Sequence, residues 1–287
     1  MIRLAHAYEE ILATYGVALA QILLTLEDTE NRRRYLNARS TLMTLLDAGV
    51  VPLINENDTV ATDEIRFGDN DRLGARVSSM ISADALILLS DIDGLYSADP
   101  SVDNDAVLIP LVTNITPDID AMAGQSKSSE GTGGMETKLA AARIAMSAGC
   151  RMVITNGHRD YPIRSLKDGG SSTWFIPNST PRVARKEWIA GSLKPQGRII
   201  IDPGAEEALK AGKSLLPAGV LEVKGYFQRG DLILVLCSDG REIARGLSAY
   251  SSEDIVLIKG HKTNEIVSLL GYRGRDEIIH RDDMAVS

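Results

Sequence analysis

Several kinds of residue are scarce in this chain, and each scarcity argues against a class of protein. The 287 residues include two cysteines, Cys150 and Cys237, each in an apolar run and far from the other. This pattern predicts buried free thiols in a reducing, cytoplasmic compartment rather than a disulfide framework. No run of 18 apolar residues occurs, and charges come too early at the N-terminus for a signal peptide. The sequence therefore predicts neither a membrane span nor a secretory signal.

Positive charge is also in short supply. The chain carries 31 Lys and Arg residues against 39 Asp and Glu residues, a formal net charge of −8, with a pI near 5.1. A surface of this sign argues against general attraction to nucleic acid. The hydrophobic content of 44% and the charged content of 24% are ordinary for a soluble globular protein. The length is sufficient for two domains.

Apolar runs alternate with helical patterns over the first 190 residues. The sequence predicts strands at 17–24, 50–54, 85–89 and 152–155, and helices at 2–15, 28–47, 70–81 and 139–148. The strands are continuous apolar runs, which is typical of parallel strands that are buried on both faces. The fold class predicted for this part is α/β, with an open, mostly parallel sheet covered by helices on both faces.

The stretch from 51 to 71 changes from an apolar strand to a run of amides and carboxylates. The strand ends in the residues 55–58 (NEND), and the stretch closes with 68–71 (GDND) at the start of a helix. Polar side chains at the carboxyl end of a strand lie where open α/β sheets bind ligands. Carboxylates suit the ammonium of a small zwitterion, and amides suit its carboxylate. The alternative is a loop of turn-forming residues that binds nothing.

A glycine-rich segment, GTGGMETK at 131–138, opens the helix 139–148. Glycines before a helix let the backbone approach a phosphate, and the helix N-terminus favours negative charge. Lys138 in the first turn can reach the same phosphates. The pattern GxxxxGK[ST] of a Walker A loop is absent. The segment therefore indicates phosphate binding of another kind, and the alternative is a flexible loop before an alanine-rich helix.

Four segments together carry a resemblance to a known family. They are INEND at 54–58, FGDND at 67–71, LLSDIDGLYSADP at 88–100 and GTGGMETK at 131–138, in this order. The chain resembles the amino acid kinase family, and within it the members that phosphorylate glutamate. The implied activity is ATP-dependent phosphorylation of the γ-carboxylate of L-glutamate, the first step of proline biosynthesis. An aspartate or uridylate kinase is the alternative within the family. A catalytically impaired fragment or a regulatory, RNA-binding protein is the alternative outside it.

The resemblance also implies roles for individual residues. Asp71 and Lys138 would be catalytic, with Asp71 orienting the basic groups and Lys138 on the phosphates. The residues implied to hold glutamate are Asn55, Asp58, Asp69 and Asn70. The residues implied to line the ATP site are Ser90, Asp91, Thr132, Gly133, Gly134, Met135, Glu136, Thr137 and Lys138. Mg²⁺ would arrive with the nucleotide, and the protein itself would hold no metal. Proline as a feedback inhibitor and a homo-oligomeric state are implied as well.

The family begins with a strand, a glycine-rich turn that contacts the phosphates, and a lysine. Residue 1 aligns inside the kinase domain of the family, and this opening segment is not found in the sequence. We therefore expect an amino acid kinase domain at 1–190 that lacks its first strand. We also expect the turnover of such a chain to be impaired, because part of the phosphate-binding apparatus would be missing.

The composition turns linker-like at 191–197, and short strands with frequent turns follow. Strands are predicted at 198–201, 220–223, 231–237, 243–247 and 255–257, which suggests a small β-barrel. Its glycine pattern resembles a PUA domain, expected at 195–275. Residues 195–287 contain 12 Lys and Arg against 14 Asp and Glu, a net charge of −2, so we do not expect RNA binding. We expect the end of the chain, 276–287, to be a surface tail. The alternative is that HRDDM at 280–284 forms a metal site.

Overall fold

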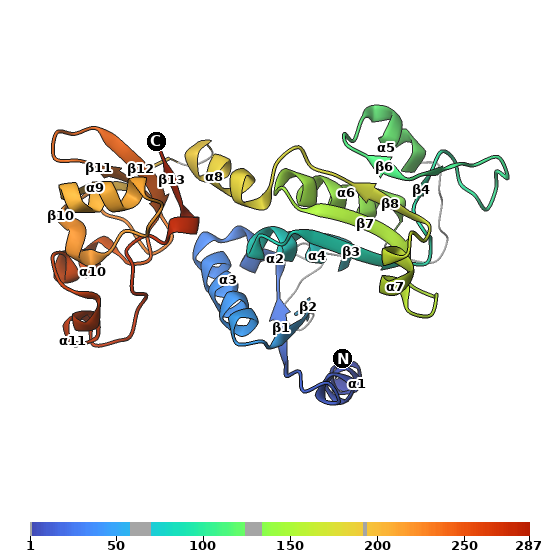
Figure 1. The fold of residues 1–287 in the computed structure, drawn as a ribbon, viewed down its shortest axis with the longest axis horizontal. Coiled ribbons are helices and arrows are strands. Elements are labelled where there is room, and N and C mark those ends of the chain that lie inside the picture. Colours follow the sequence, from blue (N-terminus) through green and yellow to red (C-terminus); the bar gives the residue numbers. More distant parts are fainter. Residues whose placement is uncertain (1, 58–69, 124–133, 192–193) are drawn as a thin grey trace. The chain divides into compact units, whose positions relative to one another are not determined.

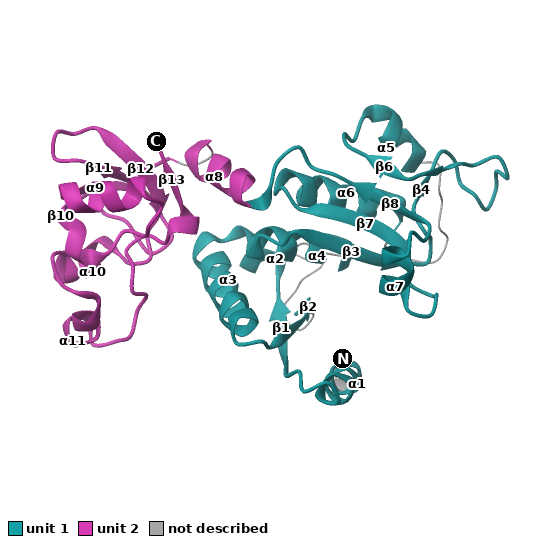
Figure 2. Ribbon diagram, in the orientation of Figure 1, with its two compact units in different colours: residues 1–181 teal, residues 182–287 magenta. Residues whose placement is uncertain are grey.

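The computed structural model describes residues 2–57, 70–123, 134–191 and 194–287 (Figure 1). The chain divides into two compact units, residues 1–181 and residues 182–287 (Figure 2). Within the described ranges, none of the helices combines the length and the apolar character that crossing a membrane requires.

The first unit begins with helices around a two-stranded parallel sheet. The elements are α1 (Ile2–Ala13), β1 (Leu19–Leu24), α2 (Leu26–Glu30), α3 (Arg32–Asp47) and β2 (Val51–Glu56). The register of the sheet runs from Leu19 opposite Val51 to Leu24 opposite Glu56. The prediction of one helix at 28–47 is wrong, because the chain interrupts it at Asn31. The backbone of Asn31 is extended (φ −73°, ψ 118°), and its side chain accepts a hydrogen bond from the Arg34 N–H. Asn31 therefore begins a new helix, as N-cap residues do.

A second sheet in the same unit has the strand order β3-β7-β8-β6. Its strands are β3 (Ala85–Ser90), β6 (Leu111–Val112), β7 (Arg151–Asn156) and β8 (Ser172–Phe175), with a separate hairpin of β4 (Leu95–Tyr96) and β5 (Leu108–Ile109). The pairs β3–β7 and β6–β8 are parallel, and β7–β8 is antiparallel. The helices are α4 (Asn70–Ile81), α5 (Pro117–Ala123), α6 (Met135–Ser147) and α7 (Pro162–Lys167). The α/β class with mostly parallel pairing is confirmed, although the described strands form two sheets rather than one.

Helix α4 contributes to the packing of both sheets. Leu73 packs with the cluster around Leu24 of β1, whereas Ala75 packs with the cluster around Leu88 of β3. Residues two apart on a helix point about 200° apart, so α4 presents opposite faces to the two clusters. Helix α6 adds the fully buried residues Ala141, Ala142 and Ala145 to the second cluster. The first turns of α4 and α6 are therefore held by well-packed helices.

Among the described residues, those that cover strand β3 lie on one of its faces. Leu88 is buried, but Ile87 and Leu89 on the opposite face are 37% and 51% exposed. In the described part of the chain, this apolar run is therefore buried on one face, whereas its pattern predicts burial on both. The reason is that α4 and α6 both pack against the face that carries Leu88. Side chains alternate between the two faces of a strand, so the opposite face keeps its apolar residues without this cover.

The second unit is built on one five-stranded sheet with the order β10-β9-β11-β12-β13. Its elements are α8 (Pro181–Gly191), β9 (Gly197–Ile201), α9 (Pro203–Lys210), η1 (Pro217–Gly219), β10 (Val220–Lys224), β11 (Leu232–Leu236), β12 (Glu242–Leu247), α10 (Ser252–Ile258), η2 (Thr263–Glu265), α11 (Ile266–Leu270), η3 (Arg281–Asp283) and β13 (Met284–Val286). The strand-rich second domain is confirmed. In the described residues its strands form a sheet with β10 and β13 at the edges, not a closed barrel.

Residues 255–257, predicted as a strand, form part of helix α10 instead. The run Ile255-Val256-Leu257 has the β-branched composition of a strand. However, the Ser251 side chain accepts a hydrogen bond from the Asp254 N–H at 3.1 Å and caps the helix. Ile255 and Ile258 then lie on one face and are fully buried. The cap and the three-residue spacing thus override the local strand preference.

The expected surface tail at 276–287 is part of the second unit's core. Ile278 and Ile279 are fully buried, and β13 pairs antiparallel with β12, with Met284 opposite Gly246. Asp283 is 3% exposed and binds Arg185 of α8 at 2.5 Å. In the residues that the structure describes, there is no group of three His, Cys, Asp or Glu residues placed to hold a metal ion. The segment therefore completes the sheet rather than forming a surface tail.

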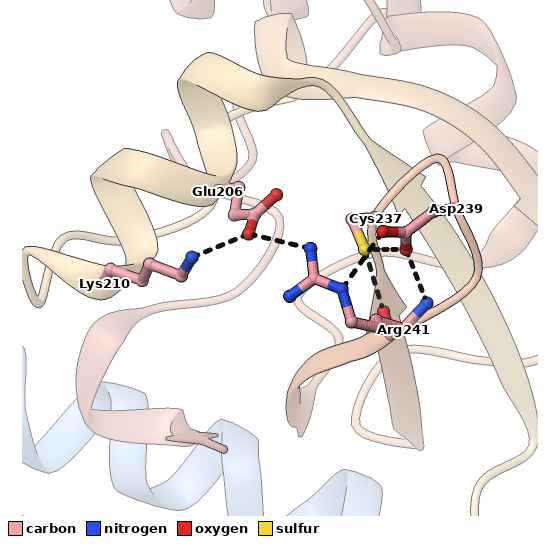
Figure 3. Close-up of polar contacts among 5 residues, drawn as sticks. All are labelled: Glu206, Lys210, Cys237, Asp239 and Arg241. Atoms are coloured by element: carbon pink, nitrogen blue, oxygen red, sulfur yellow. Dashed lines mark hydrogen bonds and ion pairs between the residues drawn. The ribbon is translucent and has the colours of Figure 1, made fainter.

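A polar cluster links α9 to the turn between β11 and β12 (Figure 3). Asp239 accepts hydrogen bonds from the Cys237 thiol at 2.6 Å and from the Arg241 backbone and side chain at 2.9 and 3.0 Å. Arg241 also lies 3.6 Å from Glu206, which pairs with Lys210 at 2.7 Å. The thiol, with the two Arg241 donors, lowers the pKa of Asp239 to about 2. The cluster thus stabilises the ionised form of the Asp239 carboxylate, which lies in an exposed turn.

We predict that Asp239→Asn has an effect that depends on pH. Because the folded pKa is lowered, the ionised carboxylate contributes stability above its ordinary pKa, and this contribution is lost as the pH falls toward about 2. The difference in unfolding free energy between wild type and Asp239→Asn should therefore be small, because the site is exposed, and should shrink from pH 5 to pH 3. Chemical denaturation of both full chains at several pH values measures it. A difference that grows on acidification would contradict the prediction.

Candidate active site

Two strands of the second sheet end in polar residues that are hydrogen-bonded to one another. The Ser90 hydroxyl, at the end of β3, donates to Asp91 at 2.8 Å. From the end of β7, the Asn156 amide donates to the Asp91 carbonyl at 3.4 Å, and the Gly157 N–H donates to the Ser90 carbonyl at 2.7 Å. The Ser90 hydroxyl lowers the pKa of Asp91, and the charge of Lys138 lowers it further. An exposed, ionised carboxylate is therefore held at this edge of the sheet.

The first turns of α4 and α6 supply a buried ion pair. Lys138 Nζ lies 3.1 Å from Asp71 Oδ2, and the two side chains are only 9% and 19% exposed. Lysine is almost never buried without a partner, so the pair explains how its charge is tolerated here. Asp71 lies in the first turn of α4, where the helix dipole also favours a carboxylate.

Thr137, the neighbour of Lys138 on α6, contacts the same carboxylate. Its hydroxyl lies 3.0 Å from Asp71 Oδ2 and 2.7 Å from the carbonyl oxygen of Gly134. Gly134 precedes the helix in an extended conformation (φ −78°, ψ −176°). Two side chains from one helix turn thus meet a single carboxylate oxygen from another helix.

We call Asp71, Ser90, Asp91, Thr137 and Lys138 the β3–α4–α6 cluster. The elements that carry it are far apart in sequence, and the influence of Lys138 on Asp91 connects its two halves. The cluster presents one buried ammonium, which is paired with Asp71 and whose charge also acts on Asp91. Such a group is a compact point charge on a flexible stem, and it is suited to stabilising phosphate oxygens. The arrangement can therefore hold and orient an anionic phosphoryl group.

The other predicted site residues fall into three groups. Asp58, Asp69, Thr132 and Gly133 lie outside the described residues. Asn55 is on β2, opposite Leu23 in the first sheet, while Asn70 is exposed at the start of α4 beside Asp71. Glu136 is exposed, and Met135 is 8% exposed within the hydrophobic core. A role of Met135 in nucleotide binding would consequently fall to its backbone.

Asn156 was not among the residues singled out from the sequence. It is the last residue of β7, and a polar run follows it to Asp160. The rule that marked residues 55–58, polar residues at the carboxyl end of an apolar strand, applies equally to Asn156. The same signal could therefore have identified it.

Comparison with known proteins agrees with this geometry. A profile of the amino acid kinase family matches residues 1–156, and a PUA domain profile matches residues 197–270. Glutamate 5-kinase of Paramagnetospirillum magneticum is 61% identical over 285 residues, which cover 99% of this chain and 77% of that protein. Glutamate 5-kinases of Rhodospirillum rubrum and Agrobacterium fabrum are 59% and 56% identical, with 99% and 100% of this chain and 76% and 74% of theirs covered. The chain belongs to the amino acid kinase family, and within it to the glutamate 5-kinases that carry a PUA domain.

Proposed function

We propose that this chain transfers the γ-phosphoryl group of ATP to the γ-carboxylate of L-glutamate. The product would be γ-glutamyl phosphate, and the reaction would be the first step of proline biosynthesis. The observation that carries the proposal is the 61% identity to a glutamate 5-kinase over 285 residues, a range that includes every residue of the β3–α4–α6 cluster. A kinase needs ATP, and the cluster offers a buried cation of the kind that phosphates require.

The chemistry asks for positioning and for positive charge more than for a base. The glutamate side chain is already an anionic nucleophile, so the difficulty is to bring it close to an anionic phosphate. Lys138 would contact the transferring phosphoryl group, and Asp71 would hold the ammonium in place from 3.1 Å. The N-terminal turn of α6 would add the positive end of the helix dipole. These groups stabilise the negative charge of the phosphoryl group in the ground state and in the transition state. They act most strongly on the charge that develops during transfer.

Mg²⁺ would enter with the nucleotide rather than through a site of its own. The described residues offer no group of three metal-binding side chains, and Asp71 is already paired with Lys138. Mg²⁺ commonly binds through one or two carboxylates together with substrate phosphates. Asp91, exposed and ionised, is the described carboxylate best suited to face it. When bound, the ion would neutralise phosphate charge.

The assay is phosphorylation of glutamate by the chain with ATP and Mg²⁺, with γ-glutamyl phosphate trapped as the hydroxamate. Aspartate and UMP in place of glutamate test the alternatives within the family. We expect hydroxamate that depends on both ATP and glutamate. Transfer to aspartate or UMP but not to glutamate would replace the proposed substrate, and no transfer to any of them would contradict the proposed function.

We predict that Asp58→Ala weakens glutamate binding. Asp58 is proposed to hold glutamate together with Asn55, Asp69 and Asn70, with its carboxylate on the substrate ammonium. A charge-assisted hydrogen bond is worth about 1.5–3 kcal/mol. KM for glutamate should therefore rise by about 10–100-fold with little change in KM for ATP. An unchanged KM for glutamate would rule out this role. Asp47→Ala, which removes an exposed carboxylate at the end of α3, is the control.

Regulation and assembly follow from the same family relation. We propose that proline inhibits by competing with glutamate, so Asp58→Ala should weaken inhibition as well. We propose a homo-oligomer, which light scattering of the purified chain would test. Cys150 and Cys237 are both free and buried, which is in keeping with a reducing, cytoplasmic location. The net charge of −2 over residues 195–287 gives no reason to propose nucleic acid as a partner.

A further inference from the structure

The geometry points to a role for Thr137 that goes beyond lining a nucleotide site. We propose that the Thr137 hydroxyl is a positioning group that holds the Asp71 carboxylate, and through it the Lys138 ammonium, in the orientation used for phosphoryl transfer. The inference rests on the proposed function for its consequence in catalysis, but its structural core stands on contacts within the chain.

The first step concerns the shared oxygen. Asp71 Oδ2 is 3.1 Å from Lys138 Nζ and 3.0 Å from Thr137 Oγ1. The two donors come from consecutive residues of α6, which project about 100° apart around the helix. A carboxylate oxygen that accepts hydrogen bonds from two directions leaves the carboxylate less freedom to rotate than a single contact with a flexible lysine does. Thr137 therefore limits the orientation of Asp71.

The second step concerns the other acceptor of the hydroxyl. Thr137 Oγ1 is also 2.7 Å from the Gly134 carbonyl oxygen, and a hydroxyl has a single proton to donate. The Gly134 carbonyl already accepts from the Thr137 and Lys138 backbone N–H groups, at 3.2 and 3.5 Å. Asp71, in contrast, is the carboxylate of the ion pair with Lys138, and a hydrogen bond to a carboxylate is the stronger, charge-assisted kind. The Gly134 carbonyl is therefore hydrogen-bonded even without the Thr137 hydroxyl, whereas the Asp71 carboxylate gains a hydrogen bond from it.

The third step concerns Lys138 itself. Its ammonium is a point charge on a four-carbon stem, so its position is set by the partners around it. Asp71 lies 3.1 Å from the ammonium in an ion pair. Thr137, by limiting the orientation of Asp71, therefore also limits the position of the Lys138 charge.

The test compares Thr137→Val, which keeps the shape but removes the hydroxyl, with Thr137→Ser, which keeps the hydroxyl. One net hydrogen bond is worth about tenfold in an equilibrium or a rate. We expect Thr137→Val to lower kcat by about tenfold with smaller changes in either KM, and Thr137→Ser to retain near wild-type kcat. Thr44→Val is the matched control, because the Thr44 hydroxyl donates to the Ser40 carbonyl of its own exposed helix turn.

A double-mutant cycle separates the two acceptors. In an Asp71→Asn background, Thr137→Val should cause little further loss of kcat if the hydroxyl acts through Asp71. A full tenfold loss in that background would mean that the hydroxyl acts through Gly134 or the helix end, and would overturn the proposal. Equal kcat values for Thr137→Val and wild type would overturn it as well.

A second readout does not depend on catalysis. Trace acetylation of the full-length chain, followed by mass spectrometry, compares the labelling of Lys138 with that of the exposed Lys167. We expect Lys138 to be labelled severalfold faster in Thr137→Val than in wild type or Thr137→Ser. If wild type makes no γ-glutamyl phosphate, the proposed function fails, and this labelling still decides the role of Thr137. Unchanged labelling would overturn the inference even in an active enzyme.

Discussion

Replacing Lys138 with alanine is expected to lower kcat by about 10²–10³-fold. Removing one donor from developing charge typically costs about 2.7–4 kcal/mol of transition-state stabilisation. Lys138 forms an ion pair with Asp71 at 3.1 Å, its charge lowers the pKa of Asp91, and it is 7% exposed. A charge held in a desolvated site acts more strongly on a phosphoryl group than a solvated lysine would.

The loss should appear in kcat more than in KM. If Lys138 acts mainly on charge that develops during transfer, ground-state binding of ATP changes less than turnover does. Steady-state kinetics with ATP and glutamate varied in turn measures both. Lys167→Ala, which removes an exposed lysine on α7, is the control and should keep wild-type kinetics. Near wild-type kcat in Lys138→Ala would place the phosphates elsewhere.

The same variant has an effect that is independent of catalysis. Lys138 contributes to the lowered pKa of Asp91, although the Ser90 hydroxyl is the larger cause. Removing the ammonium should raise the pKa of Asp91 part of the way back toward its ordinary value. The Asp91 carboxyl resonance, followed by NMR as the pH is varied, would show this shift. The absence of a shift would mean that the two halves of the β3–α4–α6 cluster are not coupled.

Much of the first unit could be predicted because its signals are local. Helix α6 begins at Met135, directly after the last glycine of the segment 131–138, and Gly149 follows the helix with φ of +73°. Strands β2 and β3 lie where the apolar runs occur. The ion pair between Asp71 and Lys138 was not predictable from spacing, since 66 residues separate two helix ends that only tertiary packing brings together. The family resemblance implied a role for each of the two residues. The contact between them is seen only in the structure.

The second unit shows where local signals mislead. The composition of residues 255–257, Ile-Val-Leu, is typical of a strand. Ser251, however, caps a helix that includes them. The end of the chain reads as polar, yet Asp283 is buried by Arg185 of α8, almost 100 residues earlier. Gly246 of β12 is part of the reason: a Cβ there would come within 2.6 Å of Ile279 and 2.9 Å of the Asp283 carbonyl oxygen. A glycine thus lets the final segment approach the sheet.

Asp283→Ala is expected to destabilise the second unit by about 3–5 kcal/mol. Removing one partner of a buried ion pair leaves a buried charge that is poorly compensated. Asp283 binds Arg185 at 2.5 Å and Arg275 at 3.4 Å, and its side chain is 4% exposed while that of Arg185 is 8% exposed. Arg185 also donates from Nε to the Asp282 carbonyl at 3.1 Å, so the pair fixes α8 to the segment before β13.

The chain provides its own probe for this experiment. It has two tryptophans, Trp174 in the first unit and Trp188 on α8, so in a Trp174→Phe background fluorescence reports unfolding of the second unit. Denaturant titrations of the full chain would compare Asp283→Ala with Glu222→Ala, whose exposed pair with Lys224 at 2.9 Å should be worth less than about 1 kcal/mol. Equal effects of the two variants would show that the buried pair is no stronger than a surface pair. A much larger effect of Asp283→Ala would establish that the last strand is anchored through α8. Loss of this one carboxylate would then free both α8 and the last strand.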